Sequence, residues 1–150
     1  MRAIIQRVSS ASVTINKIKT AEIASGFLVL VGVADNDNQA DAEWLAAKIA
    51  ALRIFSDENG LMNLDLKAID GDVLVVSQFT LIADYRKGNR PSFVHAARPE
   101  TAIPLYELFL KCLKLATGKE PQTGIFGVDM QVQLINDGPV TISMDSQTKS

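Results

Sequence analysis

Two polar segments interrupt otherwise apolar strands, and they contain the residues best suited to chemistry. Ser77-Gln78-Phe79-Thr80 ends a Val-rich run that begins at Asp72, and Asn136-Asp137-Gly138-Pro139-Val140-Thr141 separates two later apolar runs. Hydroxyl, amide and backbone groups at the end of a strand can face a cleft and bind a polar substrate. A nucleophilic Thr80 would need an adjacent base, and no His, Lys or carboxylate lies beside it in the sequence.

Other kinds of site lack the necessary residues. A metal site needs several His, Cys or clustered carboxylates, and the chain has only His95 and Cys112. Cys112 lies among apolar neighbours, where a core thiol is the usual outcome, and His95 lies in a predicted loop. The segment 124–127 lacks the glycine spacing and the Lys-Ser/Thr ending of nucleotide-binding loops. We therefore predict neither a metal nor a cofactor.

The elements that must position these residues are mostly short strands. Residues rich in Val and Ile, in alternating or unbroken apolar runs, predict strands. The unbroken run Phe27–Val33 is typical of a strand buried on both faces, so we expect it in the middle of a sheet. The other predicted strands are 2–8, 11–16, 72–81, 128–134 and 140–142, the last two flanking a Gly-Pro turn.

Two helices complete the predicted domain. Apolar residues recur at helical spacing in 38–53, and a second helix is expected to start between Pro99 and Pro104 and to end at Gly118. Two widely separated helices among runs of strands indicate an α+β fold, with a curved, mostly antiparallel sheet or partial β-barrel. With 150 residues we expect one domain, 1–150, whose polar end, 145–150, is a flexible tail.

Composition limits the partners of the chain. The formal net charge of −2 and the pI of about 5.3 argue against a broad basic surface, and hence against a DNA-binding protein. The segment 86–90, with Arg98, is either a local RNA contact or a solvated loop. The longest apolar run is far shorter than the roughly 20 residues of a membrane-spanning helix. Without a secretion signal, and with one cysteine, we expect a cytoplasmic protein.

An ordered set of short motifs resembles the D-aminoacyl-tRNA deacylase family. The motifs occur in the family's order with short, similar gaps, from the first strand to about Ile142, and only the residues from Ser143 lie outside the resemblance. Each motif alone is too short to carry the assignment. They are Ile5-Gln6-Arg7-Val8, Ala11-Ser12-Val13-Thr14, Arg53-Ile54-Phe55-Ser56-Asp57, Ser77-Gln78-Phe79-Thr80, Arg90-Pro91-Ser92-Phe93, Gln122-Thr123-Gly124 and Asn136-Asp137-Gly138-Pro139-Val140-Thr141.

The resemblance implies a homodimer that cleaves the ester between a D-amino acid and tRNA, with its two sites at the interface. In the family a Gly-Pro pair with a cis peptide bond, here Gly138-Pro139, reaches into the partner's pocket. There it would bind the α-amino group and exclude an L side chain by collision. Glycine has no side chain to collide, so we expect glycyl-tRNA to be cleaved too. The matching Arg7 would hold the Gly-Pro turn, unless it is an ordinary surface arginine.

The remaining roles are also implied by the resemblance. The backbone amides of Phe79 and Thr80 would stabilise the developing oxyanion, and Ser77 and Gln78 would bind the substrate end. At the 3′-terminal adenosine, Phe126 would stack on the adenine and Ala102 would leave room at its edge, although a core Phe and a helix Ala are the ordinary alternatives. The adenosine 2′-hydroxyl would assist the attack of water.

Two other functions remain open at this stage. The first is a non-catalytic RNA-binding module, against which the acidic balance and the aromatic content of 6% both argue. The second is a hydrolase of another small ester that uses Thr80 as a nucleophile, with a base supplied from elsewhere in the fold.

Overall fold

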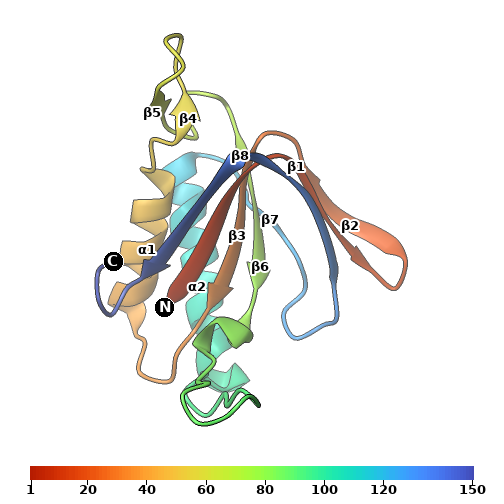
Figure 1. The fold of residues 1–150 in the computed structure, drawn as a ribbon, viewed down its shortest axis with the longest axis vertical. Coiled ribbons are helices and arrows are strands. Elements are labelled where there is room, and N and C mark those ends of the chain that lie inside the picture. The colour runs from red at the N-terminus through yellow and green to blue at the C-terminus, as the bar shows by residue number, and fades with distance from the viewer.

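The computed structural model describes all 150 residues as two helices packed against one face of a strongly curved sheet (Figure 1). The helices are α1 (Gln39–Ala50) and α2 (Pro99–Thr117), and a short 3-10 helix, η1 (Phe79–Ile82), follows one strand. The strands are β1 (Arg2–Ile15), β2 (Ile18–Ile23), β3 (Gly26–Gly32), β4 (Phe55–Ser56), β5 (Met62–Leu64), β6 (Asp72–Ser77), β7 (Gln122–Thr123) and β8 (Gln131–Asp145).

The predicted α+β architecture with a curved sheet and two main helices is confirmed, although the sheet is mixed. β1 pairs antiparallel with β2, β3 and β8, whereas β6 joins β3 and β7 in parallel. β3 lies between β1 and β6, so its unbroken apolar sequence is buried on both faces as predicted. β4 and β5 form a separate hairpin that projects from the end of the molecule (Figure 1).

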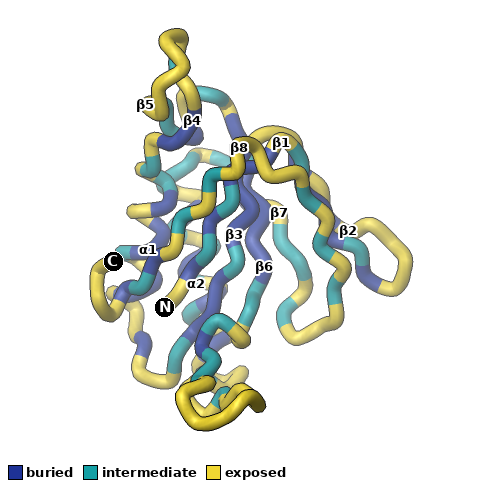
Figure 2. Tube along the Cα trace, in the orientation of Figure 1, coloured by how far each residue is buried: buried dark blue, intermediate teal, exposed yellow.

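Two apolar clusters hold the sheet in its curved form, one on each face. The larger lies between the helices and the sheet, and includes Phe27, Leu45 and Phe109, none of which is accessible to solvent. The smaller lies inside the curve, where Val13, Leu28 and Leu74 meet. Figure 2 shows the buried centre of the sheet between exposed loops at both ends. No helix is long and apolar enough to cross a membrane.

Several strand boundaries differ from the sequence prediction. β1 is one strand, and shifts in its pairing with β8 near Val8 absorb the polar break that predicted two strands. β8 is also continuous, so Gly138-Pro139 lies within a long strand where a turn between two strands was predicted. β2 was not predicted because most of its side chains, including those of Lys19 and Thr20, are exposed.

Both predicted helices are present, with shifted ends. Asn38 and Asp41 form a reciprocal capping box that starts α1, and the helix ends at Ala50, three residues before the predicted end. α2 starts at Pro99, whose missing N–H is not needed in the first turn. Pro104 therefore lies inside the helix, whereas the sequence prediction started the helix between the two prolines and so placed Pro104 in the first turn. Gly118, in the left-handed conformation, ends α2 as predicted.

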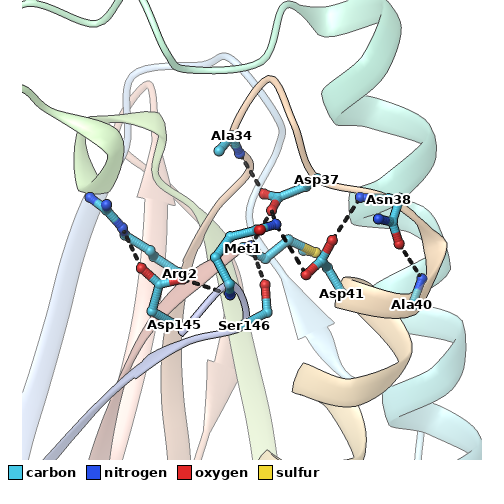
Figure 3. Close-up of polar contacts among 10 residues, drawn as sticks. Met1, Arg2, Ala34, Asp37, Asn38, Ala40, Asp41, Asp145 and Ser146 are labelled. Carbon is cyan, nitrogen blue, oxygen red and sulfur yellow. Dashed lines mark hydrogen bonds and ion pairs between the residues drawn. The ribbon is translucent and has the colours of Figure 1, made fainter. Parts of the chain in front are cut away.

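The C-terminal segment packs on the domain and is not the predicted tail. Asp145 belongs to β8, and Ser146 is buried and accepts a hydrogen bond of 2.5 Å from the amino group of Met1. The same amino group contacts the carboxylate of Asp37 at 2.5 Å (Figure 3). Burial alone would raise the pKa of Asp41, but hydrogen bonds from Ser146 and the Asn38 amide outweigh it and lower that pKa. Sequence patterns did not reveal this because polar side chains make the contacts.

Replacing Asp37 with Asn should destabilise the fold by about 3 kcal/mol or more, because breaking a buried ion pair leaves its partner charge uncompensated. The Asp37 carboxylate is buried and also accepts hydrogen bonds from the Ala34 amide at 2.6 Å and from Gln147 at 2.9 Å. Urea unfolding measures the change. The control is Asp145→Asn, which removes a largely exposed pair with Arg2 and should cost less than about 1 kcal/mol. Equal losses of unfolding free energy in the two variants would contradict the assignment of Met1–Asp37 as a buried ion pair.

Candidate functional site

Ser77-Gln78-Phe79-Thr80 lies where β6 ends and η1 begins. The Gln78 amide donates to the Val31 carbonyl at 2.7 Å, which ties this point to the neighbouring strand β3. Phe79 and Thr80 then open the 3-10 helix, whose first N–H groups have no carbonyl partner within the helix. Both residues are exposed. The segment therefore presents backbone donors and polar side chains from a fixed position at one end of the sheet.

The side chains of this segment form a local contact. The Gln78 side-chain amide donates to the hydroxyl oxygen of Thr80. Thr80 also lines an open cleft of about 870 Å³, whose lining includes His95 and Asp35. His95 lies 3.5 Å from the Asp35 carboxylate, and it makes no hydrogen bond to Thr80. Thr80 is therefore held by an amide donor, and its hydroxyl contacts no base.

Ala102 and Phe126 come to the same end of the sheet. The start of α2 is tied to the end of β3 by the hydrogen bond from the Ala97 amide to the Val33 carbonyl, at 2.9 Å. Ala102 is buried in the first turns of that helix. Phe126 follows β7, the neighbour of β6, and its ring lies 5.7 Å from the ring of Tyr106, one helical turn beyond Ala102. Phe126 is partly exposed.

Tyr106 is a residue that the sequence assigned only to the apolar face of the helix. Its side chain is 6% exposed, and its hydroxyl has no hydrogen-bond partner. Burial raises the pKa of Tyr106 to about 12, so the hydroxyl stays protonated and remains a potential donor. Helical periodicity carries no signal for an unpaired hydroxyl, which is why sequence reasoning missed it.

Tyr106→Phe should stabilise the free protein by about 1 kcal/mol near neutral pH, because an unpaired buried hydroxyl loses its hydration without compensation. The advantage should grow as pH rises from 10 to 12. In that range the tyrosine of the unfolded chain ionises while the folded one does not, so the wild type loses stability that the variant keeps. Unfolding in urea at pH 7, 10 and 11 measures both effects. A destabilised variant would show that the hydroxyl is satisfied in solution.

Gly138, Pro139 and Arg7 form a second group. Arg7 is buried, and its guanidinium donates to the Asp137 carbonyl at 2.8 Å and to the Ile54 carbonyl at 2.7 Å. It is therefore not a surface arginine. Gly138 has φ +131°, and an added Cβ would lie 3.0 Å from Nη2 of Arg7. The Gly138–Pro139 peptide bond is cis, and both residues are exposed.

The two groups lie at opposite ends of the sheet. Arg7 pairs with Phe27 at the start of β3, whereas Gln78 is bonded to Val31 near its end. Four strand residues separate these levels, or about 13 Å at 3.3 Å per residue. Figure 1 shows the middle of β8 and η1 at opposite ends of the molecule. One chain therefore does not bring Gly138-Pro139 to Ser77–Thr80.

Known proteins resemble this chain in sequence over nearly its whole length. The family model described as D-Tyr-tRNA(Tyr) deacylase matches residues 4–145. The chain belongs to this family. D-aminoacyl-tRNA deacylases of Flavobacterium johnsoniae and Cytophaga hutchinsonii are each 59% identical to it over 149 residues, which cover 99% of this chain and of each relative.

Two solved structures also resemble this deacylase family member. The structure of the c-Myc DNA Unwinding Element Binding Protein superimposes with a TM-score of 0.90 at 38% identity, covering 97% of this chain and 98% of the other. A probable eukaryotic D-amino acid tRNA deacylase superimposes with a TM-score of 0.80 at 16% identity, covering 95% and 97% of the two chains. The second likeness supports the fold alone.

Proposed function

We propose that this chain hydrolyses the ester bond of D-aminoacyl-tRNA and releases the free D-amino acid and the tRNA. The observation that carries the proposal is the family match over residues 4–145, together with relatives of the same length that bear this activity in their names. Charged tRNA is used in the cytoplasm, so we place the protein there. The substrate is the 3′-terminal aminoacyl-adenosine end of the tRNA.

The reaction needs water to attack the ester carbonyl and donors to stabilise the oxygen that becomes negative. The amides of Phe79 and Thr80 supply such donors in this proposal, at the opening of η1. Water forms the new bond to the carbonyl carbon, and the bond to the 3′-oxygen of adenosine breaks as that oxygen takes up a proton. Ser77 and Gln78 hold the substrate end, and Phe126 offers a partly exposed ring for stacking on adenine.

The contacts of Thr80 favour positioning over nucleophilic attack. Its hydroxyl oxygen accepts from the Gln78 amide, which cannot remove a proton, and no base contacts it. The 2′-hydroxyl of the terminal adenosine lies next to the ester in the substrate itself. We therefore assign proton transfer at the ester to this RNA group and leave orientation to the protein.

Chiral selection requires the two groups of the site to meet, and a homodimer brings them together. In an antiparallel pairing of two chains, Gly138-Pro139 of one copy would reach the Ser77–Thr80 end of the other. Its carbonyls would bind the α-amino group, and its backbone would collide with an L side chain. The buried Arg7, bonded to the Asp137 carbonyl, holds this segment in place. Glycyl-tRNA should pass the same filter.

A second candidate function, hydrolysis of another small ester, rests on the cleft that both Thr80 and His95 line. With Asp35 at 3.5 Å, His95 has the orienting carboxylate that a general base uses. If this base activated Thr80, the chain would cleave a small ester without assistance from RNA. Activity of the wild type on short aminoacyl esters, lost in both Thr80→Ala and His95→Ala, would favour this function.

The deciding experiment compares D-tyrosyl-tRNA, L-tyrosyl-tRNA and glycyl-tRNA as substrates of the wild type and of Thr80→Ala. We expect rapid loss of the D and glycyl esters, survival of the L ester, and an active variant, because the backbone amides remain. A folded but inactive Thr80→Ala variant would instead support a role for Thr80 as the nucleophile. Survival of all three esters would refute the deacylase proposal and favour the RNA-binding module.

A further inference from the structure

The loop that follows η1 is positively charged in a chain whose net charge is negative. Between Asp84 and Arg98 the sequence has four Lys or Arg residues and one carboxylate, whereas the whole chain carries a net charge of −2. Asp84 and Ser92 exchange two backbone hydrogen bonds of 2.8 Å, which close the base of the loop. All residues from Tyr85 to Ser92 are exposed, as Figure 2 shows at the lower end of the molecule.

Three of these cations have no partner in the protein. Arg86 is neutralised, because its guanidinium pairs with Asp84 at 2.7 Å and holds the pKa of that carboxyl well below its ordinary value. Lys87, Arg90 and Arg98 occur in none of the ion pairs. Arg98 is also the N-cap of α2, where the helix dipole disfavours a positive charge. Neither ion pairing nor helix stability therefore explains these charges.

The cations lie around the candidate site. Tyr85 and Arg86 line the cleft together with Thr80. Lys87 is the next residue in the chain and does not line the cleft. Arg98 is joined to the same region because Ala96 pairs with Ala34, another residue of the cleft. In Figure 1 the loop and the first turn of α2 lie next to η1 at one end of the molecule. A substrate whose end enters the cleft would continue past these side chains.

We propose that Lys87, Arg90 and Arg98 form a phosphate-binding surface that holds the RNA strand leading to the aminoacylated adenosine. The inference rests on the proposed function, which places the adenosine at Ser77–Thr80. Guanidinium groups match phosphate oxygens in geometry, and lysine adds a point charge. Such contacts position the strand without reading its sequence. This surface gives a chain with an acidic pI a local affinity for a polyanion.

The test is binding of uncharged tRNA, measured by fluorescence anisotropy between 50 and 200 mM salt. The variant Lys87→Gln/Arg90→Gln/Arg98→Gln should raise Kd about 10-fold to 100-fold at the lower salt, and reduce the slope of log K against log salt by about 0.7 for each phosphate that is no longer bound. The matched control, Lys17→Gln/Lys48→Gln/Lys67→Gln, makes the same change in charge at exposed positions away from the cleft and should leave both quantities unchanged.

Hydrolysis separates this inference from the proposed function. On D-aminoacyl-tRNA the triple variant should raise KM and keep kcat, and on D-aminoacyl-adenosine, which has no phosphate, it should match the wild type. A wild type that cleaves neither ester refutes the proposed function, while tRNA binding still decides the surface. Unchanged Kd and salt slope in the triple variant, or an equal loss in the control, would overturn the inference.

Discussion

Phe79→Pro is expected to lower kcat/KM on D-tyrosyl-tRNA by about 10²- to 10³-fold, the usual cost of removing one oxyanion donor. Proline has no N–H, so the substitution deletes the donor assigned to residue 79 without touching a side-chain contact of Thr80. The position tolerates proline because it is the first residue of η1, where proline is favoured. Most of the loss should appear in kcat, since the interaction strengthens only as the charge develops.

Phe79→Ala is the matched control, because it removes the same ring and keeps the N–H. That ring is 56% exposed and meets Phe93 edge-on at 5.1 Å, so its loss should cost little stability in either variant. We expect the alanine variant to stay within about 10-fold of the wild type. If both variants keep near wild-type activity, the Phe79 amide takes no part in the mechanism. If both lose activity equally, the phenyl ring of Phe79, and not its amide, is the group that catalysis requires.

Sequence patterns predicted best the elements whose burial is uniform or whose ends carry a chemical signal. The unbroken apolar run of β3 correctly indicated a central strand. The helical spacing of apolar residues indicated α1, and Gly118 marked the end of α2, because this kind of helix end depends on a single residue type at the C-terminus. In contrast, β2 was missed, since an exposed strand with lysines shows little apolar alternation.

The residues of the candidate site also differ in how well the sequence predicted their positions. Ser77–Thr80 stands out because polar residues end an apolar strand, and the structure places it at the opening of η1 beside a cleft. The position of Gly138-Pro139 could not be predicted, because a Gly-Pro pair normally breaks a strand, whereas here β8 continues through it with a shifted pairing to β1. Its distance from Ser77–Thr80 depends on the register of the four strands β8, β1, β3 and β6, which no local pattern encodes.

If each site is built from two chains, mixing two inactive variants should restore activity. A site formed within one chain would show no such recovery. Gly138→Ala should be inactive as a homodimer, because its Cβ would lie 3.0 Å from Nη2 of Arg7 and 3.1 Å from the Val140 amide, at a φ of +131° that favours glycine. Phe79→Pro should be inactive for the reason given above. If equal amounts of the two variants exchange subunits freely, half of the dimers are mixed, and each mixed dimer has one site built from two unaltered segments.

The mixture should therefore recover about a quarter of the wild-type activity, as two-fold symmetry with one intact site in each mixed dimer requires. Activity is measured on D-tyrosyl-tRNA before and after incubation at concentrations that permit exchange, and circular dichroism confirms that both variants fold. Mixing Phe79→Pro with itself is the control for dilution. Recovery that grows with incubation time would place Gly138 and Phe79 of one site on different chains. Absence of recovery despite demonstrated exchange would contradict the shared site, because a site formed within one chain would always contain the defect that this chain carries.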